Sequence, residues 1–541
     1  MKIFRFPLRV RRDSERKNGF EAGRAASYGV RMKIPVALLP FFSAAALCAA
    51  GTPEKPNIVL FLVDDMGWQD TSVPFYGNEK SELNKRYKTP NMERLAAKGV
   101  KFVRAYACPV SSPTRVSLIT GANAAQHKVT NWTSNVRSDV STDARHRTLD
   151  FEQWNINGMS PSGSKEKIKN VFPATPLPEL LRKGGYHTIH VGKAHFGTPK
   201  TLASDPRNLG FDVNIAGSAI GGPETYLVNK KQALADGGYN YGVGGNRVLG
   251  LSAYNKEGCC LTEALTRAAL AEIDAAVASD KPFFLYMSQY AVHAPYSADR
   301  AFDDRFETDY PALKGQAKTY ATMIAGMDKS LGDILDRLER DPELEKNTVV
   351  IFMSDNGGHH SNGNAPGRGG KGSCFEGGIH EPMIAYWPGV TRAGTVCDAP
   401  VVIEDFFPTI LEIAGADAGK TAQRIDGESF VPALRGEKAD ANRPLFFHYP
   451  NFWGENNGRI GAPQSAILMG KWKLVHFYDD GKTMLFDLSE DIGETRDLSE
   501  EKPGEARKLA RTLTKFLKKN DATRPIVKAT GKPCPWPDGS K

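Results

Sequence analysis

Three apolar runs, each followed by polar residues, constrain the fold of this chain more than any other feature. They cover residues 58–63, 282–289 and 348–353, and the first and third lead into Asp64-Asp65 and Asp355-Asn356. A run without polar alternation suits a strand that is buried on both faces of a parallel sheet. Because stretches with helical periodicity separate the runs, the sequence predicts an α/β fold with a large doubly wound, mostly parallel sheet flanked by helices. Ligands bind such sheets at the carboxyl ends of the strands.

Helices are expected where apolar residues recur every three or four positions between a start signal and a stop signal. These segments are residues 89–99, 175–185, 262–278, 318–338 and 404–415. Thr262 is the expected N-cap of the third helix, and residues 100–107 and 186–191 read as further strands. The polar segment 131–170 and the Gly- and Asn-rich segment 200–260 lack periodicity, which predicts surface loops.

The pattern changes after Asp426-Gly427. Short strand-like runs follow at residues 445–448, 465–469, 473–477 and 484–487, and an amphipathic helix follows at 505–518. These runs predict a smaller C-terminal subdomain, built from an antiparallel sheet plus a helix. We expect the main α/β domain to cover residues 51–428 and the subdomain to cover residues 429–541, a division that suits a chain of 541 residues.

The first 50 residues differ in composition from the rest of the chain. Residues 1–33 hold ten basic and three acidic side chains, and so contribute +7 of the formal net charge of +8. The near-neutral remainder argues against nucleic-acid binding. Residues 34–50 are apolar, follow Arg31-Met-Lys33 and end in small residues, which is typical of a secretory signal peptide and too short for a stable membrane span. Residues 1–50 are therefore expected to be a leader, with Met32 as an alternative start, and the mature protein to be periplasmic or extracellular.

Cysteine placement adds two constraints. Leu47 before Cys48 fits a lipoprotein cleavage site poorly, so soluble export is favoured over a lipid anchor. Six cysteines follow residue 50, and none of them has C-x-x-C spacing. A zinc site is therefore not expected, and disulfide pairing stays open.

The stretch Ala107–Gly121 carries the most specific pattern in the chain. Pro109 and Pro113 exclude an ordinary strand or a helix interior, and the apolar spacing after Pro113 is helical up to Gly121. Ser111 is therefore expected at a strand-to-helix turn, where backbone N–H groups favour an anion. Arg115, four residues on, adds a permanent cation on the same helix face.

The string Ser111-Ser-Pro-Thr-Arg115, followed by Leu118-Ile-Thr-Gly121, resembles the signature of the sulfatase family within the alkaline phosphatase-like superfamily. The resemblance covers about residues 55–500. In that family a Cys or Ser at the first position is oxidised to formylglycine, so Ser111 indicates the serine-type subclass. The resemblance implies a formylglycine-generating maturase as a partner, and a hydrated aldehyde that attacks the sulfur of a sulfate ester.

Two adjacent carboxylates at the end of the first run indicate a metal site. Asp64 and Asp65 would repel each other at a buried strand end unless a cation lies between them. The resemblance adds Asp355 and Asn356 as ligands, and it places an oxygen of residue 111 beside the same cation. Oxygen ligands suit a hard divalent cation, and family analogy implies one Ca²⁺.

The other catalytic residues are implied by matches to family motifs. Lys193 and His195 match a Gly-Lys-x-His motif, His293 matches a His-x-Pro motif, and Lys371 matches the lysine before Glu-Gly-Gly. Arg115 and Lys193 are implied to stabilise the attacking oxygen, His293 and Lys371 to protonate the leaving alcohol, and His195 to deprotonate the second hydroxyl. The family usually has Arg at the position of His380, so the substrate contacts near it stay open.

Export, long polar loops and aromatic residues favour a sulfated carbohydrate as the substrate. Aromatic rings pack against the apolar face of a sugar, and the candidate substrate contacts are His380, His448 and Trp453, with His359 and His360 as further pocket candidates. Two alternatives stay open. The protein is otherwise a phosphodiesterase or phosphonate hydrolase of the same superfamily, or a non-catalytic protein that binds sulfated glycans.

Overall fold

A computed structural model describes residues 55–540, except 78, 134–145, 152–153, 305, 307–312, 360–362 and 454–458. The expected leader, residues 1–50, and His360 lie outside the described residues. No helix within the described ranges combines the length and hydropathy needed to cross a bilayer.

The main sheet has the strand order β12-β2-β11-β10-β1-β9-β7-β8. The bounds are β1 (Asn57–Val63), β2 (Val100–Phe102), β7 (His187–Gly192), β8 (Val213–Ile215), β9 (Phe283–Ser288), β10 (Thr348–Ser354), β11 (Met383–Tyr386) and β12 (Thr395–Cys397). The central strand β1 is buried along its whole length and pairs in parallel with both β10 and β9. Only β11 runs antiparallel, against β10 and β2. The expected mostly parallel sheet is therefore confirmed.

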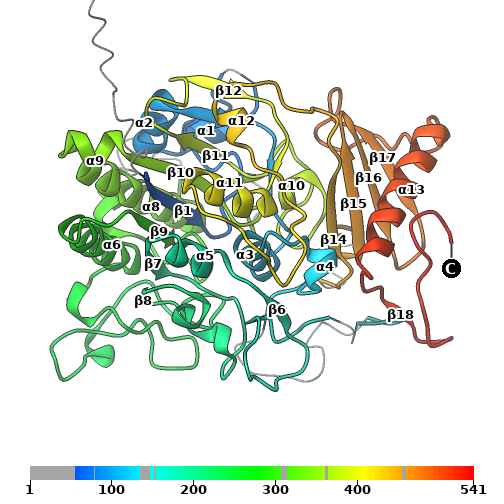
Figure 1. Ribbon diagram of the computed structural model, residues 1–541. Helices are drawn as coiled ribbons and strands as arrows, with labels where there is room; N and C mark the ends of the chain where they lie inside the picture. Colours follow the sequence, from blue (N-terminus) through cyan, green and yellow to red (C-terminus); the bar gives the residue numbers. More distant parts are fainter. Residues whose placement is uncertain are drawn as a thin grey trace, which may run out of the picture. The chain divides into compact units, whose positions relative to one another are not determined.

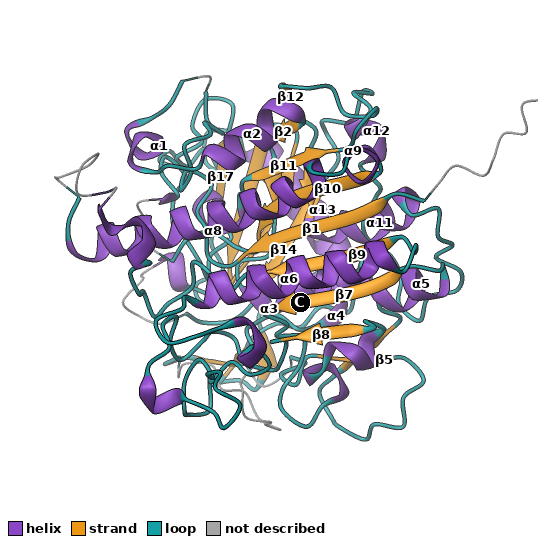
Figure 2. Ribbon diagram, turned by 90° about the vertical axis from the view of Figure 1, so that its left-hand side faces the viewer, coloured by secondary structure: helices purple, strands orange, loops and turns teal. Residues whose placement is uncertain are grey.

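Helices cover both faces of this sheet. On one face lie α2 (Pro90–Lys98), α6 (Leu261–Ala278) and α8 (Gly315–Glu339), which Figure 2 shows crossing in front of the strands. On the other lie α3 (Ser111–Thr120), α5 (Leu177–Lys183) and α11 (Phe406–Ile413). Alternate residues of β1 enter the two cores, with Val59, Phe61 and Val63 in the first and Ile58, Leu60 and Leu62 in the second. The apolar run therefore reflects burial on both faces.

A smaller antiparallel sheet follows in the C-terminal part of the chain (Figure 1). Its strands are β14 (Leu445–Tyr449), β15 (Gln464–Met469), β16 (Trp472–Phe477) and β17 (Thr483–Asp487), and α13 (Pro503–Lys519) packs on one face. The other face joins a cluster with Tyr106, Phe375 and Ile379 of the preceding part of the chain. The expected sheet-plus-helix unit is confirmed, and the boundary between residues 428 and 429 stays a prediction.

The remaining elements are short. The helices are α1 (Glu82–Arg86), α4 (Ala124–His127), α9 (Pro342–Lys346), α10 (Glu376–Ile379) and α12 (Val431–Leu434), with 3₁₀ turns η1 (Leu202–Ser204), η2 (Pro206–Leu209), η3 (Lys230–Gln232), η4 (Ser252–Tyr254), η5 (Arg300–Phe302) and η7 (Ile403–Asp405). The strands are β3 (Ala105–Tyr106), β4 (Leu149–Asp150), β5 (Met159–Pro161), β6 (Phe172–Ala174), β13 (Val401–Val402), β18 (Ile526–Val527) and β19 (Lys532–Pro533).

Three local expectations are wrong. Segment 200–260 is not simply surface loop, because it contributes the edge strand β8 and buries Tyr226 and Tyr241 in the core. Cys260, not Thr262, is the N-cap residue of α6. Residues 100–107 form two strands in two sheets, since β2 joins the main sheet while β3 pairs with β13. Each miss arises where pairing with a distant segment decides the structure.

Candidate active site

The carboxyl ends of β1 and β10 place two pairs of polar residues side by side. Val63 pairs with Ser354, so Asp64-Asp65 and Asp355-Asn356 leave the sheet at the same level. Oxygens of Asp64, Asp65 and Asp355 lie within 4.8 Å of one another, and all three residues are buried. Asn356 Nδ2 donates to Asp65 Oδ1 at 2.8 Å. The two pairs, 290 positions apart in sequence, therefore form one buried cluster.

This cluster has the chemistry of a hard-cation site. Burial and the neighbouring Asp355 raise the pKa of Asp64 to about 7. Asp65 Oδ2 is buried and accepts no hydrogen bond within the described residues. Convergent carboxylates with an open oxygen fit Ca²⁺ or a similar oxygen-seeking ion. Asp64, Asp65, Asp355 and Asn356 are the residues that would hold it.

Ser111 begins α3, directly beside the acidic cluster. Its Oγ lies 3.1 Å from Asp64 Oδ1 and 3.1 Å from Asn356 Oδ1. The helix is buried on all sides and ends at Gly121, whose φ of 67° is in the left-handed region and whose N–H donates to Ser117 O. This ending is the usual glycine stop. The expected strand-to-helix turn at Ser111 is therefore present.

Two buried cations lie behind Ser111. Lys193 Nζ lies 3.0 Å from Ser111 Oγ and 2.6 Å from Asp64 Oδ2. Arg115 donates through Nε and Nη2 to Asp355 Oδ2, at 3.0 and 2.8 Å, and does not line the cavity. Although burial raises the pKa of Asp355, Arg115 and Lys193 outweigh it and hold that pKa below its usual range. Arg115 thus contacts a candidate metal ligand, and its implied role in stabilising the attacking oxygen stays a prediction.

Lys371 and His293 approach Asp65 from the open side. Lys371 Nζ lies 2.6 Å from Asp65 Oδ1, and His293 Nε2 lies 3.7 Å from Asp65 Oδ2. His293 Nδ1 contacts Ala294 O at 2.6 Å, so Nδ1 carries the proton and Nε2 faces the site. Burial and the Lys371 ammonium lower the pKa of His293 to about 3. In the free protein the proton therefore resides on Lys371, whose pKa is raised by Asp65 and Asp64 against the effect of burial.

His195 occupies the opposite wall. Its Nε2 donates to Thr133 O at 2.9 Å, and its Nδ1 has no hydrogen-bond partner within the described residues. Burial and the Lys193 charge lower its pKa well below the usual range. The backbone φ values of His195 and Asp65 are 55° and 61°, a left-handed conformation that is costly for residues with a side chain. Two of the residues with this costly conformation therefore follow the ends of strands β7 and β1, at the candidate site.

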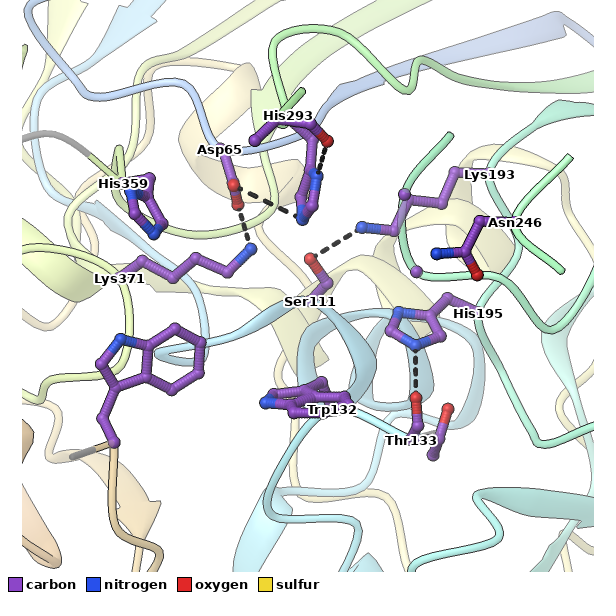
Figure 3. Close-up of a pocket in the computed structure, with 14 residues that line it drawn as sticks. Asp65, Ser111, Trp132, Thr133, Lys193, His195, Asn246, His293, His359 and Lys371 are labelled. Atoms are coloured by element: carbon purple, nitrogen blue, oxygen red, sulfur yellow. Dashed lines mark hydrogen bonds and ion pairs between the residues drawn. The ribbon is translucent and has the colours of Figure 1, made fainter. Parts of the chain in front are cut away.

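Part of this set lines one cavity of about 320 Å³ (Figure 3), whereas Asp64, Arg115, Asp355 and Asn356 do not line it. Its lining residues are Asp65, Ser111, Trp132, Thr133, Lys193, His195, Gly221, Gly222, Asn246, His293, Ala294, His359, Lys371 and Trp453. Trp453 and His359 therefore lie where they were expected. Trp132, Asn246 and the pair Gly221-Gly222 were missed, because they come from segments without periodicity or motif. One sequence feature could have pointed to this wall of the cavity, namely the large aromatic residue Trp132 in an otherwise polar segment. In the structure this side chain is 40% exposed.

Two expected substrate contacts are wrong. His380 is 3% exposed, contacts Val103 O at 2.9 Å and stacks between the rings of Trp68 and Tyr106. His448 is 2% exposed and lies within hydrogen-bonding distance of Ser465 Oγ and Thr523 O. Neither residue lines the cavity. His380 Nδ1 lies 3.0 Å from Glu376 Oε2, so both nitrogens of each ring have partners inside the protein, which the residue type alone does not reveal.

Comparison with known proteins places this arrangement in a family. The family model described as Sulfatase matches residues 56–416, and a model described as N-sulphoglucosamine sulphohydrolase, C-terminal, matches residues 370–523. A sulfatase of Formosa agariphila is 30% identical, over 90% of this chain and 92% of the relative. The N-acetylgalactosamine-6-sulfatase of Canis lupus familiaris is 32% identical, over 82% of this chain and 75% of the relative.

A solved structure agrees. The crystal structure of Ps i-CgsB in complex with k-i-k-neocarrahexaose is 29% identical and superposes with a TM-score of 0.66, covering 86% of this chain and 94% of that chain. The matched family segment contains the buried carboxylate cluster, Ser111 and every lining residue of the cavity except Trp453. The chain therefore belongs to the sulfatase family and is a sulfatase enzyme.

Proposed function

We propose that this sulfatase removes sulfate from a sulfated carbohydrate, with residue 111 in its formylglycine form as the nucleophile. The observation that supports it most is the contact set of Ser111 Oγ, which lies within 3.1 Å of Asp64, Asn356 and Lys193. The Ser111 side chain therefore lies next to the candidate cation site and next to the Lys193 ammonium, both of which stabilise negative charge on an attacking oxygen. The oxidation removes two hydrogens from the Ser111 side chain and requires a maturase as the oxidising partner.

A bound divalent cation, Ca²⁺ in our proposal, supplies Lewis-acid charge that neutralises sulfate oxygens and favours the deprotonated nucleophile. Asp64, Asp65, Asp355 and Asn356 hold it. Arg115 fixes the orientation of Asp355 through two hydrogen bonds to a single oxygen. The buried Lys193 provides a second positive charge beside the attacking oxygen.

The two sides of the cavity divide the proton transfers. Lys371 and His293 lie together beside Asp65 and protonate the leaving alcohol oxygen. The negative charge of a bound sulfate ester near His293 raises the pKa of that ring from its low value in the free protein, because an opposite charge favours the protonated ring. His195 keeps Nε2 on Thr133 and has Nδ1 available, so it accepts a proton from the residue-111 hydroxyl during product release.

A carbohydrate is the proposed substrate because aromatic rings and polar groups share the cavity. Trp132 and Trp453 offer apolar ring faces, and Asn246 and Thr133 offer hydrogen-bonding groups. The relatives support this class: one acts on N-acetylgalactosamine 6-sulfate by its name, and one is crystallised with a neocarrahexaose.

Export completes the proposal. In residues 1–50 a basic segment is followed by an apolar run and then by small residues, which is the pattern of a signal peptide. We therefore expect cleavage near residues 49–53. A periplasmic or extracellular location is where sulfated polysaccharides are met. N-terminal sequencing of protein from its native host tests this, and an intact N-terminus at residues 1–33 would contradict export.

The decisive experiment measures kcat/KM for the matured protein with Ca²⁺. The panel contains sulfated N-acetylgalactosamine, neocarrahexaose-type oligosaccharides, an aryl sulfate and a phosphodiester, with released sulfate or phosphate as the readout. We expect the highest value for a sulfated saccharide. A preference for the phosphodiester would favour a phosphodiesterase, and binding of sulfated saccharides without turnover by matured protein would favour a glycan-binding role.

A further inference from the structure

A cluster of buried charges lies outside the cavity, between the small sheet and the loop that carries Lys371. Lys473 on β16 places Nζ 2.8 Å from Glu376 Oε1 and 2.8 Å from Glu494 Oε1. All three side chains are at most 1% exposed, and none lines the cavity. Buried charges are costly unless paired, and removing one partner leaves the others uncompensated. The cluster is therefore a rigid connection, and removing the Lys473 charge would leave both carboxylates buried without their ion-pair partner.

Glu494 also binds the backbone of the Lys371 loop. Its Oε2 accepts the N–H of Glu376 at 2.6 Å, and its backbone oxygen accepts from Arg368 Nη1 at 3.2 Å. Arg368 O in turn accepts the N–H of Gly377 at 2.8 Å. Residues 368 and 376 flank Lys371 in sequence. Both ends of the loop are thus tied to Glu494.

The small sheet holds the middle of the loop by two further contacts. Gln464 Oε1 on β15 accepts the N–H of Cys374 at 3.0 Å. The ring of Phe375 packs 6.1 Å from that of Phe477 and 6.2 Å from that of Phe486. Charge, hydrogen bonds and apolar packing therefore all connect the small sheet to residues 368–377.

At the other end of this connection, Lys371 has little freedom. Its N–H donates to Gly358 O at 3.3 Å, and the next residue, Gly372, donates to Pro109 O at 2.7 Å. Its ammonium is 2.6 Å from Asp65 Oδ1. A displacement of the loop by about 1 Å would break this last contact, and displacements of that size at reacting groups cost up to about 100-fold in rate.

We propose that Lys473, Glu376 and Glu494 are positioning residues that hold Lys371 in register with Asp65 and the substrate. The small C-terminal sheet is then part of the working enzyme and not only a covering layer. This inference rests on the proposed role of Lys371 in turnover. None of the three residues touches substrate, so their effect passes through Lys371.

Lys473→Met tests the proposal, because it removes the charge while keeping the side-chain length. We expect kcat to fall about 10- to 100-fold with KM changed less. The loss is larger for a sugar sulfate than for an aryl sulfate, because the poorer leaving group depends more on the proton from Lys371. Lys508→Met, on the exposed face of α13, is the matched control and leaves both values unchanged.

A double-mutant cycle separates positioning from a general loss of structure. We expect Lys371→Ala combined with Lys473→Met to be no slower than Lys371→Ala alone. Losses that multiply would overturn the positioning role while leaving the function of Lys371 intact. No loss in Lys371→Ala itself would overturn both. Where Lys473→Met does not fold, Glu494→Gln replaces it, since it keeps the shape and one ion pair, and the same pattern at smaller amplitude is expected.

Discussion

Lys193 Nζ lies 3.0 Å from Ser111 Oγ, although the two residues are 82 positions apart in sequence. The same ammonium contacts Asp64 Oδ2 at 2.6 Å, and all three side chains are buried. One lysine therefore links the candidate nucleophile to a candidate metal ligand. Negative charge that develops on residue 111 forms beside a cation in a medium of low dielectric, where the stabilisation is strongest.

The first prediction concerns Ser111. Ser111→Ala removes the proposed precursor of formylglycine, so we expect kcat/KM to fall by at least about 1,000-fold with the melting temperature nearly unchanged. Mass spectrometry of the peptide from the active wild-type protein should show the loss of two hydrogens at position 111. Unchanged turnover in the Ala variant, or an unmodified serine in fully active protein, would contradict the assignment.

The second prediction concerns the cation. Chelator-treated protein should lose activity and regain it with Ca²⁺, because Asp64, Asp65 and Asp355 supply oxygen ligands. Ca²⁺ should also raise the melting temperature, as expected for a ligand of the folded state, with about 2.7 kcal/mol gained at 100 times Kd. Asp355→Asn should weaken the thermal response. A response that persists unchanged in this variant would place the ion elsewhere.

The sequence predicted the strands that carry Asp64 and Asp355 because a strand buried on both faces must be apolar throughout, and the residues after it stand out. It predicted the turn at Ser111 because two prolines restrict the backbone around it, and the resemblance to the family signature implied the role of that serine. It did not predict Trp132 or Asn246, whose segments reach the cavity through contacts with distant parts of the chain. It misplaced His380 and His448, because a histidine with both nitrogens engaged inside a protein has the same letter as one that faces substrate.

The third prediction concerns Gly221 and Gly222, which pack closely against the rings of His195 and His293. A Cβ at Gly222 would lie 2.7 Å from His293 Nδ1, and one at Gly221 would lie 2.7 Å from His195 Cε1. Neither glycine has a left-handed φ, so a methyl group displaces the ring without straining the backbone. We expect Gly222→Ala to lower kcat/KM about 10- to 100-fold. Gly504→Ala, with no atom within 4 Å of its Cβ, is the control, and equal activity in both would refute this role.

The fourth prediction concerns pH and stability. Burial and the adjacent Asp405 raise the pKa of Glu404 to about 7, while Asn123 Nδ2 donates to Glu404 Oε1 at 2.7 Å. Because the folded-state pKa exceeds the unfolded value, the contribution to stability is fully present below pH 4.5 and is lost as the pH rises through 7. Glu404→Gln keeps the acceptor without the charge. As the pH rises from 5 to 9, the free energy of unfolding of this variant should increase relative to that of the wild type, by about 3 kcal/mol at most.

Urea unfolding at several pH values measures this difference. Glu412→Gln, at an exposed position on the nearby helix α11, is the control and should follow the wild type at every pH. A parallel pH dependence of wild type and Glu404→Gln would show that Glu404 ionises normally.

The last prediction concerns the two tryptophans of the cavity. Trp132 is 40% exposed, and Trp453 packs its ring against Gly372, next to Lys371. Both residues line the cavity that holds Ser111 and Lys371, and Figure 3 shows Trp132 beside Ser111. Their ring faces can pack on the C–H face of a sugar, whereas a small aryl sulfate reaches Ser111 without needing both. Removing a ring should therefore cost binding to the saccharide and spare the chemistry.

Trp132→Ala and Trp453→Ala should each lower kcat/KM for a sulfated saccharide about 10-fold, chiefly through KM, since an aromatic contact contributes about 0.5–1.5 kcal/mol beyond the area it buries. The value for the aryl sulfate should change much less, so the ratio of the two specificity constants is the informative quantity. Trp132→Phe keeps a ring and should keep most of that ratio. If the Ala variants lower kcat/KM equally for both substrates, the rings support the shape of the cavity instead of contacting a sugar. The carbohydrate proposal then loses its structural basis.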